Sequence, residues 1–236
     1  MNYQISLVFP LFNEESRMKN IPCIMECFRK LFECDFEIIL VCNGCVDQTL
    51  SIAIEYSTKY EEISIIETPV AGRGNALKLG FLQSTSDLIA VCSIDRSWDE
   101  SFYSVAKNLL ETGNYDVIYG PKSHPSSTVV RPFYRTLPSY LIKNYISVLF
   151  NIHPVDTNCI KMFRRSSCDF VGLLSEFNYF AETEFYLLAL RENLKIFSIP
   201  VFVNDSGKGS KVHLSSLMQF VSESIRFKFF GSNIYV

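Results

Sequence analysis

Short apolar runs alternate with amphipathic segments through the first 120 residues. Apolar runs at residues 5–9, 36–42, 63–67, 88–94 and 116–119 predict five strands. Between them, residues 20–32, 47–60, 75–84 and 100–112 predict helices, because apolar residues recur there every three or four positions. The strands are continuous apolar runs without polar alternation. We therefore expect a mostly parallel sheet with helices on both faces.

The pattern changes after Gly120. Residues 121–130 predict a polar loop, and helices are expected at 131–150, 175–190 and 214–230, with a strand at 196–203. Pro138 is expected to kink or split the helix 131–150, since proline lacks an amide hydrogen and its ring clashes with the preceding turn. We expect one domain over residues 1–213, followed by an amphipathic C-terminal helix at 214–236.

Composition excludes several classes of protein. The 236 residues carry 22 Lys+Arg and 25 Asp+Glu, a net charge of −3, whereas a nucleic-acid-binding protein needs a basic face. With 48% hydrophobic residues the chain is not largely disordered. The mean hydropathy is high, at +0.14. No apolar stretch reaches the roughly 18–20 residues of a membrane-spanning helix, and the first residues do not resemble a signal peptide.

The eight cysteines are too dispersed for a small disulfide scaffold, and free thiols in the cytosol are the expectation. Cys42 and Cys45 form a single CxxC, without a second pair or a nearby His pair to complete a zinc site.

Polar and glycine residues collect where four predicted strands end. These stretches are residues 10–15, 42–47, 72–75 and 93–95. In open parallel sheets, ligands bind outside the carboxyl ends of the strands. We therefore expect the functional site at this edge of the sheet.

Taken together, the four stretches resemble motifs of the family 2 glycosyltransferases, which have the GT-A fold. Pro10-x-x-Asn13-Glu14-Glu15 is similar to the opening PxxNE motif, and residues 41–49 (VCNGCVDQT) are similar to VDDGSxDxT. Residues 72–80 are similar to GKGxAxxxG, and Ser93-Ile94-Asp95 stands where the family has its DxD motif. Two departures are Cys42, where relatives often have Asp, and Ser93, which replaces one DxD carboxylate. In an alternative register Asp95 is the first Asp and Ser97 replaces the second.

The second half resembles the dolichyl- and polyprenyl-phosphate sugar synthases within this family. Residues 156–165 resemble D-x-x-x-G-F-[KR]-x-[FY]-R, but the match is out of step by one residue and lacks the glycine. Residues 180–184 (FAETE) resemble F-x-[DE]-x-E, residues 209–212 (GSKV) a G-x-S-K loop, and Arg135-x-x-x-Ser139 an R-x-x-x-S motif. The ordered set spans about residues 4–215.

This resemblance implies a GT-A αβα sandwich with a C-terminal helical extension. Residues 1–120 would form a nucleotide-sugar-binding half and residues 121–213 an acceptor half. It implies an inverting, metal-dependent glycosyltransferase that moves a hexose from a GDP- or UDP-hexose to a polyprenyl (dolichyl-type) phosphate. Mg²⁺ or Mn²⁺ would neutralise the leaving diphosphate. The alternatives are transfer to a soluble or glycan acceptor, or a weakly active nucleotide-sugar-binding protein.

The resemblance also assigns roles to individual residues. Asp95 would bind the metal, and the acidic pair Glu182 and Glu184 would handle the sugar. The expected catalytic residues are Asp95, Glu184, Arg135 and Lys211. The expected donor-binding residues are Pro10, Asn13, Glu14, Asn43, Asp47, Arg73 and Ser93. The expected acceptor-binding residues are Lys122, Arg131, Ser139, Ser210 and Glu182.

The segments 131–150 and 214–230 combine aromatic and aliphatic residues with Lys and Arg, which suits helices lying in a membrane interface. The alternative is that both helices pack on the core or on a dimer partner, and an oligomer is compatible with the sequence. The first interpretation places the protein in the cytoplasm, peripherally bound to the cytoplasmic membrane face.

Overall fold

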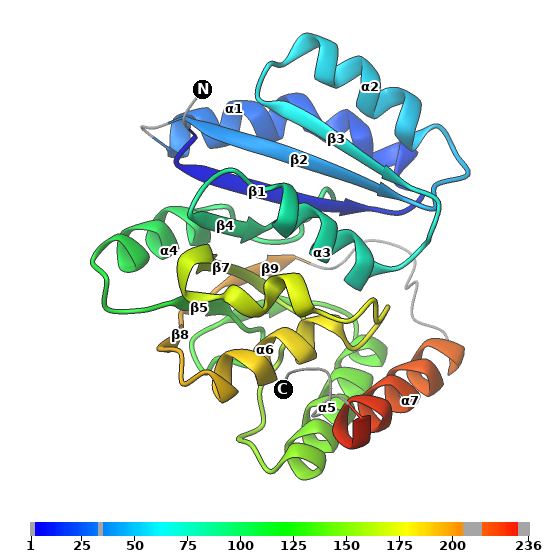
Figure 1. The fold of residues 1–236 in the computed structure, drawn as a ribbon, viewed down its shortest axis with the longest axis vertical. Coiled ribbons are helices and arrows are strands. Elements are labelled where there is room, and N and C mark those ends of the chain that lie inside the picture. Colours follow the sequence, from blue (N-terminus) through cyan, green and yellow to red (C-terminus); the bar gives the residue numbers. More distant parts are fainter. Residues whose placement is uncertain (1–2, 33–34, 205–213, 231–236) are drawn as a thin grey trace.

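A computed structural model describes residues 3–32, 35–204 and 214–230 (Figure 1). The strands are β1 (Ile5–Leu11), β2 (Phe36–Asn43), β3 (Ile63–Thr68), β4 (Leu88–Val91), β5 (Val117–Gly120), β6 (Thr128–Val130), β7 (Ile160–Arg164), β8 (Ile196–Ser198) and β9 (Phe202–Asn204). The α-helices are α1 (Ile21–Leu31), α2 (Thr49–Lys59), α3 (Arg73–Gln83), α4 (Ser101–Glu111), α5 (Phe133–Phe150), α6 (Ala181–Arg191) and α7 (Leu214–Phe230).

One seven-stranded sheet organises the described part of the chain, in the order β3-β2-β1-β4-β7-β5-β8. Strand β7 is antiparallel to β4 and β5, and the other neighbouring strands are parallel. A separate pair joins β6 to β9. The predicted α/β class with a mostly parallel sheet is therefore confirmed.

Helices cover both faces of this sheet, with α1, α2 and α4 on one face and α3 and α6 on the other (Figure 1). Adjacent residues of β1 point to opposite faces. Leu7 packs in the cluster that includes Phe28 of α1, whereas Val8 packs in the cluster that includes Ala76 of α3. Leu7 and Val8 are both fully buried. Burial of both faces explains why the strands are continuous apolar runs.

The second half departs from the sequence prediction at three places. Strand β7 lies where no strand was expected, because Lys161 and Arg164 interrupt its apolar pattern. The single strand expected at 196–203 is wrong, since β8 and β9 are separate and belong to different sheets. Residues 175–180 are not helical, and α6 begins only at Ala181.

Two further differences are smaller. Helix α5 is continuous, and Pro138 lies inside it, so of the predicted kink or split the split does not occur. Pro138 sits close to the start of α5, where the carbonyl left without its usual donor belongs to the first turn. The loop expected at 121–130 ends in the short strand β6.

Helix α7 packs on the second half through one face. Phe220 is buried beside Phe180, with ring centroids 5.6 Å apart, and Tyr145 Oη lies 2.9 Å from Ser224 Oγ. The carboxylate of Glu223 accepts the backbone N–H groups of residues 178, 179 and 180, directly before α6. Through Glu223, helix α7 thus fixes the segment before α6. The amphipathic pattern of α7 did not indicate this contact.

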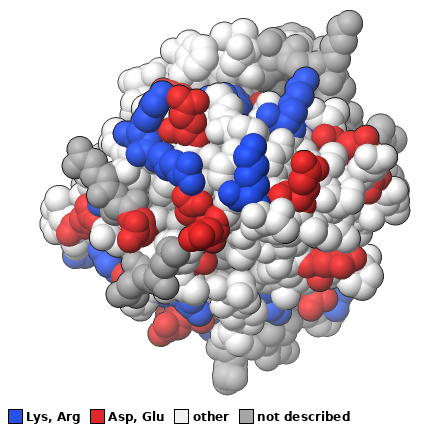
Figure 2. All heavy atoms as spheres, turned by 90° about the horizontal axis from the view of Figure 1, so that it is seen from above, with Lys and Arg blue, Asp and Glu red and all other residues white. Residues whose placement is uncertain are grey.

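No helix within the described ranges is long and apolar enough to cross a membrane. Charged side chains of both signs are interspersed on the face seen from above (Figure 2).

Candidate active site

A cavity of about 210 Å³ opens at the carboxyl end of β4, at the edge of the sheet where the sequence motifs predict the site. We call it the Glu182 cavity. Its lining residues come from both halves of the chain: Arg73, Val91, Cys92, Ser93, Trp98, Asn158, Cys159, Ile160 and Glu182. The predicted donor-binding residues Arg73 and Ser93 thus meet Glu182, which was expected on the acceptor side.

Two asparagines tie together the loops that follow β1, β2 and β3. Asn13 has a positive φ of 51°, and its Oδ1 accepts the N–H of Val46 at 2.9 Å. Asn43 Nδ2 donates to the carbonyl of Leu11 at 2.6 Å, and Asn43 Oδ1 accepts the N–H of Gly72 at 3.0 Å. The amide side chains of Asn13 and Asn43 therefore hold the loops in place.

The acidic residues of the first two loops form a similar cross-link. Asp47 accepts the backbone N–H of Glu15 at 3.2 Å, and Glu15 accepts the N–H of Gln48 at the same distance. Glu14 is paired with Arg17 at 2.5 Å. Pro10 lies in β1, opposite Val41 of β2. These contacts join the loops after β1 and β2 to each other, and Pro10, Glu14 and Asp47 are not among the residues that line the Glu182 cavity.

Two glycines allow backbone segments to approach closely around these loops. Gly44 has a φ of +60°, and a Cβ there would lie 2.7 Å from the Cβ of Ala71. At Gly74, in the first turn of α3, a Cβ would lie 1.8 Å from the carbonyl oxygen of Phe177. Glycine at position 74 therefore lets α3 meet the segment that leads into α6.

Asp95 presents an ionised carboxylate at the end of the β4 segment. Its Oδ1 accepts the hydroxyls of Ser93 and Ser97 at 2.8 Å and the N–H of Ser97 at 3.1 Å. Desolvation raises the pKa of the Asp95 carboxyl, but these hydrogen bonds outweigh it and hold that pKa below 3.8. Ser93, which stands where the DxD motif has its first Asp, thus donates a hydrogen bond to the carboxylate of Asp95.

A divalent cation fits Asp95 only if the ligand supplies further oxygens. Among the described residues, no group of three or more His, Cys, Asp or Glu is arranged to hold a metal. The hydrogen bonds from Ser93 and Ser97 all go to Oδ1 of Asp95. Mg²⁺ is commonly held by one or two carboxylates together with phosphate oxygens. The donor set around Asp95 is compatible with such a shared site.

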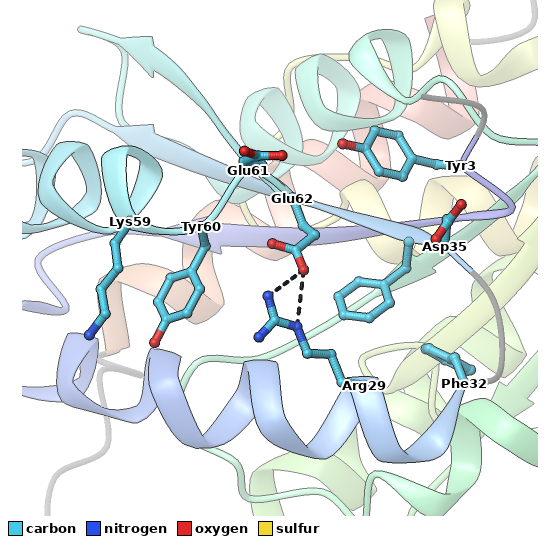
Figure 3. A pocket seen from close by; sticks show the side chains of 9 residues that line it. Tyr3, Arg29, Phe32, Asp35, Lys59, Tyr60, Glu61 and Glu62 are labelled. Carbon is cyan, nitrogen blue, oxygen red and sulfur yellow. Dashed lines mark hydrogen bonds and ion pairs between the residues drawn. The ribbon is translucent and has the colours of Figure 1, made fainter.

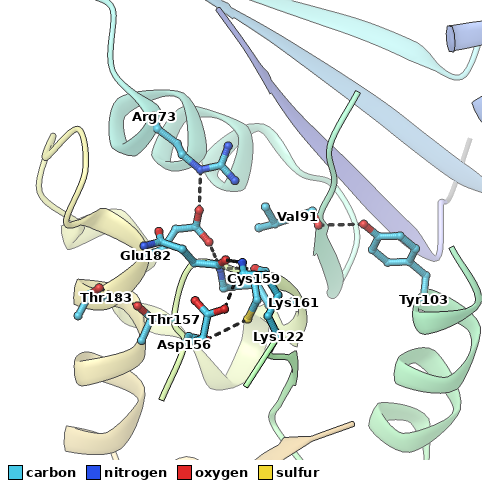
Figure 4. Close-up of polar contacts among 11 residues, drawn as sticks. Arg73, Val91, Tyr103, Lys122, Asp156, Thr157, Cys159, Lys161, Glu182 and Thr183 are labelled. Atoms are coloured by element: carbon cyan, nitrogen blue, oxygen red, sulfur yellow. Dashed lines mark hydrogen bonds and ion pairs between the residues drawn. The ribbon is translucent and has the colours of Figure 1, made fainter. Parts of the chain in front are cut away.

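Glu182, on α6, is buried between two cations (Figure 4). Arg73 Nε donates to Glu182 Oε1 at 2.5 Å, and Lys161 Nζ donates to Glu182 Oε2. Burial raises the pKa of the Glu182 carboxyl, but the charges and hydrogen bonds of Arg73 and Lys161 outweigh it and lower that pKa from 4.5 to about 2. The carboxylate is thus charged at neutral pH. The two terminal nitrogens of Arg73 donate to no other described residue and remain for a ligand.

A second cavity, of about 260 Å³, is lined by three cations. We call it the Arg131 cavity. Its lining residues are Lys122, Ser123, Val129, Arg131, Thr136, Ser139, Tyr140, Lys143 and Asp156. Arg131 Nη1 donates to Ser139 Oγ at 3.4 Å, and Lys122 Nζ lies 3.1 Å from an Asp156 oxygen. The structure therefore brings together three predicted acceptor-binding residues: Lys122, Arg131 and Ser139.

Comparisons with known proteins identify the family of the chain. The family model described as glycosyl transferase family 2 matches residues 6–172. The chain is a family 2 glycosyltransferase.

Relatives of this family 2 glycosyltransferase include a dolichyl-phosphate β-glucosyltransferase of Trichomonas vaginalis. It is 26% identical over 239 residues, which cover 96% of this chain and 73% of that protein. Mannosyl-3-phosphoglycerate synthase of Rubrobacter xylanophilus has the same GT-A fold, with a TM-score of 0.71 at 14% identity over 98% of this chain and 75% of that one. Glucosyl-3-phosphoglycerate synthase of Mycobacterium tuberculosis, in complex with Mn²⁺ and UDP, gives a TM-score of 0.67 at 15% identity and covers 96% of this chain and 80% of that one.

Not every predicted site residue of the glycosyltransferase lies at the two cavities. Glu184 is fully buried, and its carboxylate accepts the N–H and hydroxyl of Ser175, the hydroxyl at 2.7 Å. The expected pairing of Glu182 with Glu184 is therefore not seen. Ser210, Lys211 and the side chain of Arg135 lie outside the described residues.

Sequence reasoning about the glycosyltransferase missed Lys161 and Trp98. Lys161 is 1% exposed, and its ammonium also donates to the carbonyl of Cys159 at 3.0 Å. Its place in the loosely matching segment 156–165 was the only sequence signal. Trp98 lines the Glu182 cavity, and its indole lies 4.7 Å from Lys122 Nζ.

A wider hollow, of about 540 Å³, lies at the amino ends of β1, β2 and β3 (Figure 3). Arg29 and Glu62 form an ion pair across it, with Arg29 Nη2 2.5 Å from Glu62 Oε1. This end of the sheet is opposite the motif residues. Ligands of open parallel sheets bind at the carboxyl ends, so we assign the active site to the smaller cavities.

Proposed function

We propose that this glycosyltransferase moves glucose from UDP-glucose to a polyprenyl phosphate of the dolichyl type, with inversion at the anomeric carbon. The observation that carries the proposal is the Arg131 cavity, which is lined by three cations, one of which, Lys122, contacts residues of the Glu182 cavity. The choice of glucose and lipid phosphate follows the names of the relatives, and UDP follows the ligand of the neighbouring fold.

Lys122 connects the two cavities. Lys122 lines the Arg131 cavity. Its ammonium donates to the backbone carbonyl of Asn158 at 2.7 Å and lies over the Trp98 ring. Asn158 and Trp98 both line the Glu182 cavity. A phosphate held by Lys122 and Arg131 would thus lie next to a sugar in the Glu182 cavity. Such proximity replaces a bimolecular encounter with an oriented one.

The chemistry needs little help from a base. A phosphomonoester has a second pKa of about 6, so it is largely dianionic at neutral pH. One of its oxygens attacks the anomeric carbon, the bond from that carbon to the diphosphate oxygen breaks, and UDP leaves with the bonding electrons. Attack from the face opposite UDP inverts the configuration.

The leaving diphosphate requires positive charge. Arg73 is held at Nε by Glu182, which aims its remaining nitrogens as preorganised donors. Mg²⁺ or Mn²⁺ at Asp95 would add a Lewis acid that neutralises the diphosphate.

We further propose that α5 and α7 bring the enzyme to a membrane surface. The two helices expose large apolar side chains: Leu137, Tyr140, Leu141, Val148, Met218, Val221, Ile225, Phe229 and Phe230. Tyr140 belongs to this surface and to the wall of the Arg131 cavity. A prenyl chain that leaves this cavity would meet apolar surface. Cosedimentation with phosphatidylcholine vesicles tests the proposal, and protein that stays in the supernatant would contradict it.

The transfer itself is tested with radiolabelled UDP-glucose, dolichyl phosphate and Mg²⁺ or Mn²⁺ in detergent. We expect radiolabel in the organic phase, but none when dolichol replaces dolichyl phosphate, because the alcohol lacks the anionic nucleophile. Arg131→Gln should raise KM for dolichyl phosphate about tenfold or more, since a charge-assisted hydrogen bond is lost. The matched control Arg29→Gln lies at the opposite end of the sheet and should leave KM unchanged. Transfer only to a soluble phosphomonoester would refute the lipid acceptor.

A further inference from the structure

The Glu182 cavity combines one aromatic ring with several planar polar groups. Trp98 supplies the ring, and the polar groups include Arg73, Asn158 and Glu182. A pyranose ring carries C–H groups on its faces and hydroxyls on its edge, so it is matched by an aromatic face together with carboxylate, amide and guanidinium groups. At ~30 Å³ for each water, the 210 Å³ of this cavity correspond to about seven water molecules. This volume suits a single sugar ring.

The main chain around Trp98 is fixed on both sides. Trp98 itself forms an isolated antiparallel bridge with Val203 of β9. The N–H of Asp99 donates to the carbonyl of Phe202 at 3.0 Å, and the N–H of Asn204 donates to the carbonyl of Ser97 at 2.8 Å. A side chain on so well anchored a segment is preorganised before any ligand binds.

Trp98 also faces a cation of the neighbouring cavity. Lys122 Nζ lies 4.7 Å from the centroid of the indole ring, within the range of a cation–π interaction. The side chain of Lys122 is only 17% exposed, and its ion pair with Asp156 holds it in place. Trp98 therefore stands where the Glu182 cavity meets the Arg131 cavity.

We propose that Trp98 is the platform on which the donor's sugar ring stacks, beside the phosphate-binding Lys122. This inference rests on the proposed function and deepens it, because it names the residue that contacts the sugar part of the donor. The nucleoside diphosphate part does not contact Trp98. Removal of the ring therefore weakens the binding of a nucleotide sugar and leaves the binding of the bare nucleotide unchanged.

The chain contains one tryptophan, so its intrinsic fluorescence reports this ring alone. Wild-type protein is titrated with UDP-glucose and, separately, with UDP, both with Mg²⁺ present. We expect UDP-glucose to quench or shift the emission of Trp98, whereas UDP should bind, as measured by calorimetry, with little change in emission. Equal emission changes for the two ligands, or none for a bound UDP-glucose, would overturn the proposal.

Two variants give an independent readout. Trp98→Leu removes the aromatic face and should weaken UDP-glucose binding about tenfold, the size of an aromatic contact of ~1–1.5 kcal/mol. Trp98→Phe keeps a face and should weaken UDP-glucose binding less than threefold, roughly a third of that energy. UDP affinity should be unchanged in both variants, which also shows that each is folded. Unchanged UDP-glucose affinity in Trp98→Leu would refute the platform. If wild-type protein does not bind UDP-glucose, the proposed function fails, and this inference fails with it.

Discussion

Breaking the buried ion pair between Lys161 and Glu182 should strongly destabilise the second half of the molecule. The side chains of Lys161 and Glu182 are 1% and 4% exposed. Replacing Lys161 by Met keeps much of the volume but leaves the Glu182 carboxylate with Arg73 alone, which is 44% exposed. Removal of one partner from a buried pair costs about 3–5 kcal/mol. Because domains are stabilised by only ~5–15 kcal/mol, this is a large fraction of the total.

Urea unfolding at pH 7, followed by circular dichroism, measures this loss. The matched control is Lys107→Met, which breaks the helical pair of Lys107 with Glu111, a residue that is 45% exposed. The control should change the free energy of unfolding by less than about 0.5 kcal/mol. The double variant Lys161→Met with Glu182→Gln should lose less stability than the sum of the two single variants, because it removes both members of the buried pair and leaves neither charge unpaired. Strict additivity, or a Lys161→Met variant as stable as wild type, would refute the reasoning.

Acid should weaken the same pair. The pKa of Glu182 is lowered from 4.5 to about 2 in the folded protein, a difference of 2.5. At 1.36 kcal/mol for each pKa unit, this corresponds to about 3 kcal/mol. The stabilisation is fully present above pH 4.5 and is lost as the pH falls toward 2, with about 2 kcal/mol lost by pH 3. The free energy of unfolding of Glu182→Gln should therefore fall less steeply between pH 6 and pH 3 than that of wild type, and parallel curves would contradict this.

Three further predictions concern other parts of the site. Gly74→Ala should destabilise the fold by at least ~1–3 kcal/mol in thermal unfolding, because a Cβ there would overlap a backbone carbonyl, whereas Gly172→Ala meets ordinary contacts and should be nearly neutral. Glu223→Gln should lower the melting temperature, since its carboxylate accepts three N–H groups before α6, and an unchanged Tm would exclude this role. Asp95→Asn should abolish the gain in UDP-glucose affinity that Mg²⁺ or Mn²⁺ gives, as measured by calorimetry. If the variant still binds UDP-glucose more tightly with the metal than without it, Asp95 is not the metal ligand.

The first half of the fold could be predicted because each strand and helix is indicated by the pattern of apolar residues within its own segment. Continuous apolar runs such as those of β1 and β2 directly indicate strands buried on both faces. Once these strands are parallel, their carboxyl ends must share one edge of the sheet. The meeting of Arg73 with Ser93 at one cavity therefore follows from the order of elements.

The second half could not be predicted in the same way, because its key contacts are distant in sequence. Lys161 interrupts the apolar pattern of β7, so the sequence does not indicate a strand there. Its burial is stabilised by the ion pair with Glu182, which lies 21 residues later in the chain. The fixing of α6 by Glu223 likewise joins residues more than 40 positions apart. Amphipathic periodicity showed that α7 is a helix, but not which buried N–H groups its carboxylate would meet.

The central claim is that the two adjoining cavities transfer glucose from UDP-glucose to a lipid phosphate. The most direct measurement is the anomeric configuration of the product that purified wild-type enzyme forms from UDP-α-glucose and dolichyl phosphate, read by proton NMR. The account predicts a β-linked glucosyl phosphate on the lipid. An α-linked product would contradict the direct attack of the phosphate, and the absence of any glucolipid with active UDP-glucose binding would contradict the assignment of the acceptor.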